Sequence, residues 1–163
     1  MKGIEKDIIA LLQEDSRISC DRLAAMLGVS REEAAATVKQ LEDSGAIVKY
    51  TAIVNGDLTD DEVVEALIEV KVTPQRGAGF DAIAQEIAEH DEVKNLYLMS
   101  GGYDLAVIVE CKSLKSVSRF VSERISTYES VLSTATHFIL KKYKVEGALM
   151  KKGEGMDRLS VQP

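Results

Sequence analysis

Two short segments near the start of the chain repeat apolar residues at the spacing of amphipathic helices. The first helix is predicted over residues 3–13. The second is indicated by Ser19, a favourable N-cap residue, and by Gly28, which suits the left-handed backbone that often ends a helix. The apolar faces of the two helices consist of Ile4, Ile8, Leu11 and Leu12, and of Leu23, Ala24 and Leu27.

A third helix has a recognisable start and end. The sequence SREE at residues 30–33 is a capping box, in which Ser30 can accept from the amide of Glu33 while the Glu33 carboxylate reaches back to the amide of Ser30. Gly45 suits a left-handed C-terminal cap, so the helix is predicted over residues 31–44. Its inward face consists of Ala34, Val38 and Leu41. Three helices joined by brief turns are typical of a helix-turn-helix domain.

The residues after the third helix change in character. Residues 47–55, IVKYTAIVN, are rich in β-branched and aromatic side chains, and we expect one or two strands there. Together with the three helices, these strands predict a winged-helix-like domain. Residues 55–62, NGDLTDDE, combine turn-forming residues with acids and indicate a solvated connection to a second domain.

The second half of the chain alternates between strand-like and helical patterns. The predicted order is a strand ending at Pro74, a helix in FDAIAQEIAEH, two strands in VKNLYLMS and DLAVIVEC, a helix in LKSVSRFVSERIS and a last strand in VLSTATHFILKKYK. The turn between the middle strands is Gly101-Gly102-Tyr103, where the glycines can supply positive φ angles. The βαββαβ order predicts a ferredoxin-like α+β domain, with both helices on one face of an antiparallel sheet.

These patterns divide the chain into two domains. The predicted parts are a helix-turn-helix domain over residues 1–55, a linker over 56–63, a ferredoxin-like domain over 64–145 and a polar tail over 146–163. The ferredoxin-like sheet has a face without helices, which a second copy of the domain can cover. We therefore expect a dimer.

Composition and charge fit a packed globular protein but argue against a protein that coats nucleic acid. The 163 residues are 45% hydrophobic and 29% charged, with no Trp and a formal net charge of −7. Residues 1–56 contain seven Lys and Arg against nine Asp and Glu. Because phosphate binding depends on Lys and Arg, any DNA contact must come from the distribution of charge and not from its sum.

Few residues suggest metal or catalytic chemistry. Cys20 and Cys111 lie far apart and are expected to be reduced thiols of a cytoplasmic protein, and His90 and His137 are isolated. No nucleophile elbow, P-loop or dinucleotide motif occurs, so we expect no metal, no cofactor and no enzymatic activity. The first residues form an amphipathic helix and not a signal peptide, and no apolar run is long enough to span a bilayer.

Three stretches of the chain occur together in a recognisable order. They are IIALLQEDSRIS with LAAMLGVS and VKQLEDSGAIVKYTAIVN in the first domain, SGGYDL after a strand of the second, and THFILKKYK near its end. With these stretches the chain resembles the leucine-responsive/asparagine-regulator (Lrp/AsnC) family of transcription regulators. The resemblance covers residues 3–144. The family often has an arginine one position before Val38, where this chain has Thr37.

The resemblance implies double-stranded DNA as a partner, with the third helix in the major groove. The exposed side of that helix offers donors and acceptors that can meet base edges or phosphates. The expected contact residues are Ser30, Arg31, Glu32, Ala36, Lys39 and Gln40. The cluster Lys141, Lys142 and Lys144 is expected to be a solvated strand end, with a DNA contact as the less favoured interpretation.

The resemblance also implies a small-molecule effector, an amino acid, bound between subunits of a homodimer that can assemble further, up to an octamer. In such a pocket loop amides can receive the carboxylate of the effector, and Asp104 can meet its ammonium group. Thr134 and Thr136 match positions that face the pocket from a neighbouring subunit. The expected effector residues are Ser100, Gly101, Gly102, Tyr103, Asp104, Thr134 and Thr136.

Two alternative functions remain open at this stage. Siroheme decarboxylases resemble the same two-domain architecture and use it for catalysis, and a recognition helix poor in donors would suit such an enzyme. The chain has few of the histidine and basic residues that a tetrapyrrole needs. The other alternative is a metabolite-binding oligomer that acts only through protein partners.

Overall fold

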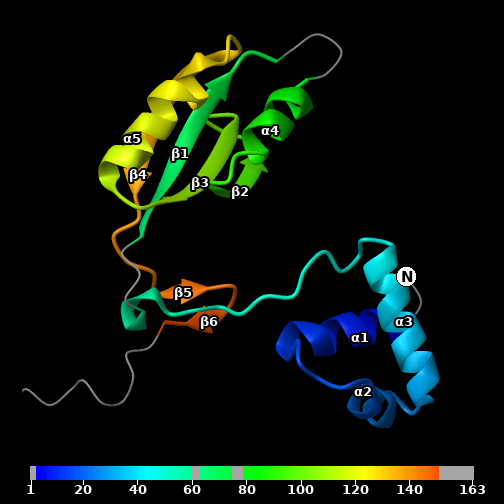
Figure 1. Cartoon of the computed structure of the whole chain (residues 1–163). Coiled ribbons are helices and arrows are strands. Elements are labelled where there is room, and N and C mark those ends of the chain that lie inside the picture. The colour runs from blue at the N-terminus through cyan, green and yellow to red at the C-terminus, as the bar shows by residue number, and fades with distance from the viewer. Residues whose placement is uncertain (1–2, 60–62, 75–78, 151–163) are drawn as a thin grey trace, which may run out of the picture. The chain divides into compact units, whose positions relative to one another are not determined.

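The computed structural model of the chain describes residues 3–59, 63–74 and 79–150. The chain divides into two compact units, Met1–Val54 and Asn55–Pro163, shown in Figure 1 and called unit 1 and unit 2 below. No helix in these residues is both long and apolar enough to cross a membrane.

Unit 1 consists of three helices around a small core. The helices are α1 (Gly3–Glu14), α2 (Cys20–Leu27) and α3 (Arg31–Asp43). One apolar face of each helix points inward, as their spacing predicts. The buried core residues are Ile8, Leu23, Ala24, Ala34 and Leu41.

The predicted helix ends are confirmed. The hydroxyl of Ser19 accepts from the amide of Arg22, and the hydroxyl of Ser30 accepts from the amide of Glu33 at 3.1 Å. The reciprocal bond of the predicted capping box, from the amide of Ser30 to the Glu33 carboxylate, is not found among the described residues. Gly28 and Gly45 have φ angles of 68° and 72°, the left-handed conformation that glycine adopts without steric cost. Sequence alone therefore locates all three helices to within a residue or two.

The strands predicted over residues 47–55 are wrong. No residue between Ala46 and Val54 is assigned to a strand, and the side chain of Val48 is 90% exposed. A strand is stabilised by hydrogen bonds to a neighbouring strand, and the described part of unit 1 contains none. The segment is instead attached to α3 through Tyr50, whose hydroxyl donates to Oε1 of Glu42 at 3.0 Å.

Unit 2 contains the predicted βαββαβ fold. Its sheet has the order β2-β3-β1-β4 with every neighbouring pair antiparallel, and Figure 1 shows both helices on one face. The elements are β1 (Val64–Val72), α4 (Asp81–Ala88), β2 (Val93–Leu98), β3 (Leu105–Cys111), α5 (Leu114–Glu123) and β4 (Val131–Phe138). Short 3-10 turns, η1 (Gly56–Leu58) and η2 (Ile125–Thr127), complete the connections.

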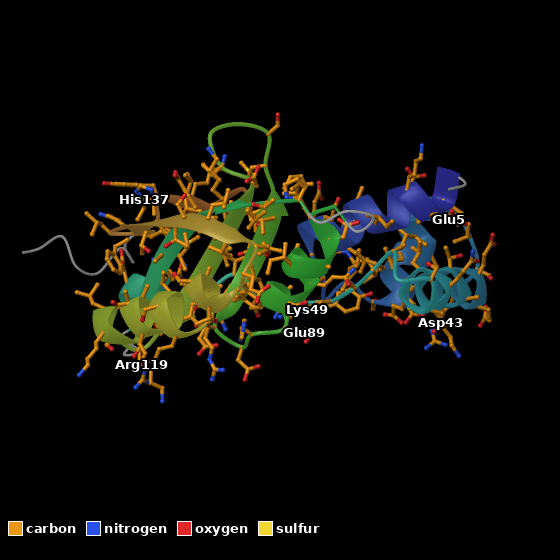
Figure 2. The ribbon with its side chains drawn as sticks, turned by 90° about the horizontal axis from the view of Figure 1, so that it is seen from above. Glu5, Asp43, Lys49, Glu89, Arg119 and His137 are labelled. Atoms are coloured by element: carbon orange, nitrogen blue, oxygen red, sulfur yellow. The ribbon has the colours of Figure 1, made fainter. Side chains whose placement is uncertain are left out.

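The two faces of the sheet differ in burial. Along β1, Ala66, Ile68, Val70 and Val72 are buried under the helices, whereas the alternate residues lie on the open face. In Figure 2, His137 on β4 and Arg119 on α5 lie on opposite sides of the unit. The core of unit 2 contains thirteen buried residues, more than twice as many as that of unit 1.

The end of the chain differs from the prediction in two respects. The last strand of the sheet stops at Phe138, although the prediction extends it to residue 144. Residues 144–149 then form a small hairpin of β5 (Lys144–Val145) and β6 (Ala148–Leu149). The predicted polar tail therefore begins inside an ordered hairpin, because Glu146 and Gly147 make a two-residue turn with φ angles of 44° and 82°.

Candidate DNA-binding helix and effector loop

The six residues predicted to contact DNA all lie on α3 or at its N-cap, and all six are exposed. Ala34 and Leu41 anchor the helix in the core, so the side that carries Ala36, Lys39 and Gln40 faces solvent. None of these three side chains makes a hydrogen bond or ion pair within the described residues. Within the described part of unit 1, this surface is therefore free of polar partners.

The connection between α2 and α3 is short and well defined. The amide of Val29 donates to the carbonyl of Ala24 at 3.1 Å, and Gly28 provides the left-handed residue between the helices. Ser30 then caps α3. When two helices are joined by such a turn, the second helix projects from the surface of the domain. A projecting helix of this kind fits the major groove of DNA.

Two polar side chains of α3 already have partners. Nε of Arg31 lies 3.1 Å from Oδ1 of Asp21, an exposed ion pair that ties α3 to α2. The hydroxyl of Thr37 donates to the carbonyl of Glu33 at 2.8 Å. Lys39 has no carboxylate within ion-pair distance in the described residues, so it is the unpaired cation of the helix.

Acidic groups dominate the far end of α3. Glu42 accepts the hydroxyl of Tyr50, and Asp43 is exposed at the end of the helix (Figure 2). Partial burial and the hydrogen bond to Glu42 raise the pKa of Tyr50 above its ordinary value. The positive character of the helix is thus confined to Arg31 and Lys39.

The loop between β2 and β3, residues 99–104, carries the predicted effector residues. The amide of Met99 donates to the carbonyl of Asp104, and the amide of Asp104 donates to the carbonyl of Val70. Oδ2 of Asp104 also accepts from the amide of Val72 at 2.9 Å. The half-buried carboxylate therefore attaches the loop to β1, a structural role that the sequence did not predict.

Polar groups in this loop remain open. Oδ1 of Asp104 accepts no hydrogen bond from the described residues, and the backbone amides of residues 100–103 donate to none of them. A carboxylate oxygen therefore lies on the same loop as several unpaired N–H groups. Such a combination can bind the two charged ends of a zwitterion.

The expectation that Gly101 and Gly102 supply positive φ angles is wrong. The glycines with positive φ in the described residues are Gly28, Gly45, Gly79 and Gly147. A Cβ atom added at either glycine of the loop would meet no heavy atom within 4 Å. Their small size leaves the space above the backbone open, which is the feature that a ligand would use.

Thr134 and Thr136 lie on β4, and both are half-buried on the side of the sheet that faces the helices. Thr134 is opposite Val70, whose carbonyl accepts the amide of Asp104, and Thr136 is opposite Ile68. Thr136 also lines an open groove of ≈ 590 Å³ against α5. Within one chain, β1 therefore separates the threonines from the loop.

Two further grooves were not predicted from the sequence. One, of ≈ 480 Å³, lies between the end of α1 and residues 46–53. The other, of ≈ 490 Å³, lies beside α5 and the adjoining ends of β2 and β3 and includes Lys112, Arg119 and Arg124. None of the three grooves found among the described residues includes a residue of the loop 99–104.

The remaining cysteines and histidines have ordinary structural surroundings. Cys20 is partly exposed and Cys111 is buried, and both are free thiols. Burial, and then the nearby Glu92 and Glu110, raise the pKa of Cys111. Nε2 of His90 lies 3.1 Å from the hydroxyl of Tyr128, and His137 pairs with Glu69. The described residues contain no cluster of three side chains that could hold a metal ion.

Comparison with known proteins accounts for both units. Residues 3–42 match the AsnC-type helix-turn-helix domain, and residues 65–149 match the Lrp/AsnC ligand binding domain. The chain is 43% identical over 160 residues to YugG of Bacillus subtilis, an uncharacterised HTH-type transcriptional regulator. That alignment covers 98% of this chain and 96% of YugG.

Solved structures at lower identity share the fold. The transcriptional regulator NMB0573 of Neisseria meningitidis, solved as a complex with L-Met, has a TM-score of 0.70 at 22% identity and covers 89% of this chain and 93% of its own. AsnC of E. coli has a TM-score of 0.66, also at 22% identity, over 89% of this chain and 95% of its own.

Proposed function

The chain belongs to the Lrp/AsnC family of transcription regulators, and from this membership we propose that it binds DNA through α3 and responds to an amino acid bound at the loop 99–104. The loop 99–104 is the basis for the proposed amino-acid binding. Its free Asp104 oxygen and its unpaired amides suit the ammonium and carboxylate groups that all amino acids share.

DNA recognition by this chain would use few cations. Lys39 would meet a phosphate or a guanine, Gln40 an adenine, and Glu32 a cytosine amino group. Arg31 would have to exchange its exposed pair with Asp21 for a DNA contact, at small cost because exposed pairs contribute only about 0–1 kcal/mol. Each phosphate contact contributes about 0.9 to the slope of log K against log salt, so contacts from α3 alone would give only a shallow weakening of binding with salt.

The effector site would be completed by a second subunit. Thr134 and Thr136 are separated from the loop of their own chain by β1, so they could reach an effector only at the loop of another subunit. Because the threonines lie on the helix side of the edge strand β4, they could reach that loop only in a contact at this edge of the sheet. The open face of the sheet offers a separate surface on which a dimer could form. The L-Met found with the Neisseria regulator supports an amino acid as the ligand class.

We propose a regulator and not an enzyme, since the relatives are named as transcriptional regulators. A mobility-shift titration of the DNA upstream of the protein's own gene, with and without a panel of amino acids, tests the proposal. We expect a shift that salt weakens and that at least one amino acid changes. A purified protein that absorbs like a tetrapyrrole and shifts no DNA would instead support the decarboxylase alternative.

A further inference from the structure

Residues 139–150 comprise the small hairpin of β5 and β6 and the segment that leads into it, and they are called the C-terminal hairpin below. Lysines outnumber acids in this stretch, as cations also do in residues 112–124. The C-terminal hairpin contains Lys141, Lys142 and Lys144 against one acid, Glu146, in a protein of net charge −7. The proposed DNA-reading helix, by contrast, has two cations and four acids. This distribution of charge is opposite to what a DNA-binding protein with a single contact surface would need.

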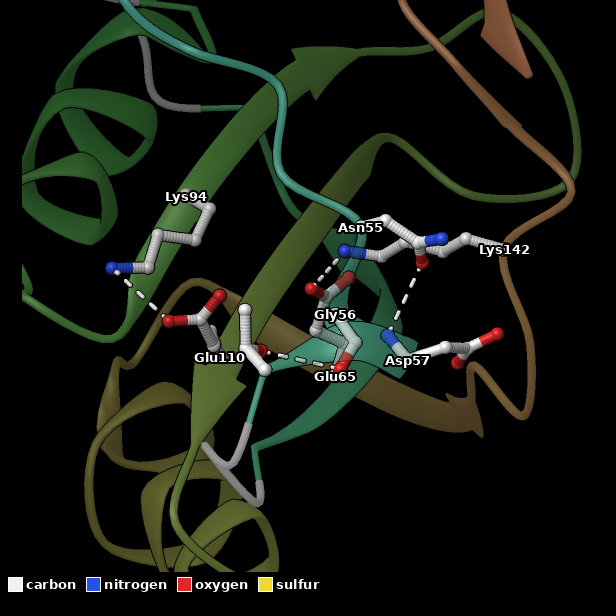
Figure 3. A network of polar contacts seen from close by, with 8 residues as sticks. Asn55, Gly56, Asp57, Glu65, Lys94, Glu110 and Lys142 are labelled. Atoms are coloured by element: carbon white, nitrogen blue, oxygen red, sulfur yellow. Dashed lines mark hydrogen bonds and ion pairs between the residues drawn. The ribbon is translucent and has the colours of Figure 1, made fainter. Parts of the chain in front are cut away.

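The C-terminal hairpin is anchored at its base. The amide of Ile139 donates to the carbonyl of Glu65 at 2.9 Å, and the ammonium of Lys142 pairs with the carboxylate of the same residue. Figure 3 shows this pair, with the 13% exposed side chain of Glu65 next to Glu110 on the neighbouring strand. Lys142 therefore neutralises Glu65, which lies beside the like-charged Glu110, and attaches the start of the C-terminal hairpin to β1.

The tip of the C-terminal hairpin is ordered as well. The amide of Met150 donates to the carbonyl of Tyr143 at 3.0 Å, and the turn holds Glu146 at a positive φ angle that non-glycine residues rarely adopt. Such a backbone persists only where the surrounding contacts maintain it. The hairpin is therefore a defined element and not a frayed strand end.

Two lysines of the C-terminal hairpin remain available. Lys141 and Lys144 are exposed, and neither has a carboxylate within ion-pair distance in the described residues. The ammonium of Lys141 lies 5.0 Å from the ring centre of Tyr143, which is itself 72% exposed. A cation–π contact of this kind orients the lysine without neutralising it.

From these observations we infer that the C-terminal hairpin is a second DNA contact, in which Lys141 and Lys144 bind phosphates of a DNA duplex. The inference rests on the proposed DNA binding. Phosphate contacts are independent of sequence, so the hairpin adds affinity and leaves specificity to α3. It provides the positive charge that the helix-turn-helix unit lacks.

The test compares two double variants of the full-length protein. Lys141→Gln/Lys144→Gln removes the proposed contacts. Lys112→Gln/Lys115→Gln removes the same charge from the other basic stretch, residues 112–124, as the charge-matched comparison. Fluorescence anisotropy with a labelled duplex gives Kd between low and moderate salt. In the hairpin variant, we expect the slope of log K against log salt to become shallower by about two units, because each phosphate contact contributes about 0.9. The control should retain the wild-type slope.

Each other result overturns the inference. Equal loss of slope in both variants would mean that only the overall charge matters, and no loss in either would exclude the hairpin. Phosphatidylserine vesicles serve as a further probe, and lysine-dependent binding to vesicles but not to DNA would assign the hairpin to a membrane. If the wild-type protein binds no duplex, the proposed function fails together with the inference. If the wild-type protein binds DNA and the hairpin variant keeps the wild-type slope of log K against log salt, the inference fails and the proposed function stands.

Discussion

The proposed recognition helix α3 and the proposed effector loop 99–104 hold their candidate residues in different ways. Lys39 and Gln40 lie on the solvent side of α3 and have no partner in the described part of the chain, while Ala34 and Leu41 maintain the fold from the opposite side. Asp104, in contrast, serves the fold and the proposed ligand with the same carboxylate.

This difference decides how easily function can be separated from folding. On α3, substitutions of exposed residues should change DNA binding and leave stability intact. In the loop, a substitution that removes the proposed ligand contact can also detach the loop from β1. The two units also differ in the size of their cores, since five buried residues stabilise unit 1 and thirteen stabilise unit 2.

The largest effect should come from a matched pair of core substitutions. Ile8→Ala in unit 1 and Ile68→Ala in unit 2 each remove a fully buried isoleucine, and each should cost about 2–5 kcal/mol of unfolding free energy. Because a small core has little stability to lose, Ile8→Ala should unfold its unit at growth temperature and abolish DNA binding. Calorimetry should then show the transition of unit 2 alone. Equal losses of melting temperature in a single shared transition would contradict the separation of the units.

A charge reversal on α3 should come next. Lys39→Glu should weaken DNA binding by more than tenfold, because it replaces a phosphate or guanine contact worth about 1–3 kcal/mol with a repelling charge. Lys6→Glu, on the exposed side of α1, is the control with the same change of net charge. Anisotropy titrations and thermal melts check both. If the two variants lose equal affinity, α3 is not the reading helix.

Two substitutions of Asp104 should separate its roles. Asp104→Asn keeps an oxygen for the amide of Val72 but removes the charge that would attract an ammonium group. It should retain stability and weaken amino-acid binding about ten- to a hundredfold, the loss of a charge-assisted hydrogen bond of about 1.5–3 kcal/mol. Asp104→Ala should lose both. Calorimetric titration of an amino acid that binds the wild type is the measurement, and equal binding by the Asn variant would remove Asp104 from the site.

The smallest effect should come from the helix caps. Ser30→Ala and Ser113→Ala each remove a hydroxyl that accepts from a first-turn amide at 3.1 Å, one on α3 and the other on α5. Each should cost about 1 kcal/mol. Because unit 1 has the smaller core, the same loss should lower its melting temperature further than that of unit 2. The opposite order in calorimetry would show that core size does not limit unit 1.

Much of the fold follows from local signals in the sequence. The helices of unit 1 are predictable because Ser19, Ser30 and Gly28 define their ends and because apolar spacing defines their buried faces. The βαββαβ order is predictable because strands and helices differ in periodicity. These signals lie within a few residues of the structure that they determine.

The predictions that were wrong or missed concern structure that depends on distant residues or on weak local signals. Residues 47–55 have strand-forming side chains but no partner strand in the described part of unit 1, and a single sequence does not reveal this. The hairpin turn at Glu146 and Gly147 has only one glycine as its signal. The attachment of Asp104 to Val72 spans 32 residues and depends on the sheet register, which no motif in the sequence encodes.

We propose that DNA and an amino acid bind to different units of this regulator and that each changes the affinity for the other. The most direct measurement is the Kd for the protein's own upstream DNA, determined by anisotropy at fixed salt with and without a saturating amino acid identified by calorimetry. We predict a change of about 5- to 150-fold, and by linkage the DNA must change the amino-acid affinity by the same factor. An identical DNA Kd in both conditions would contradict the claim.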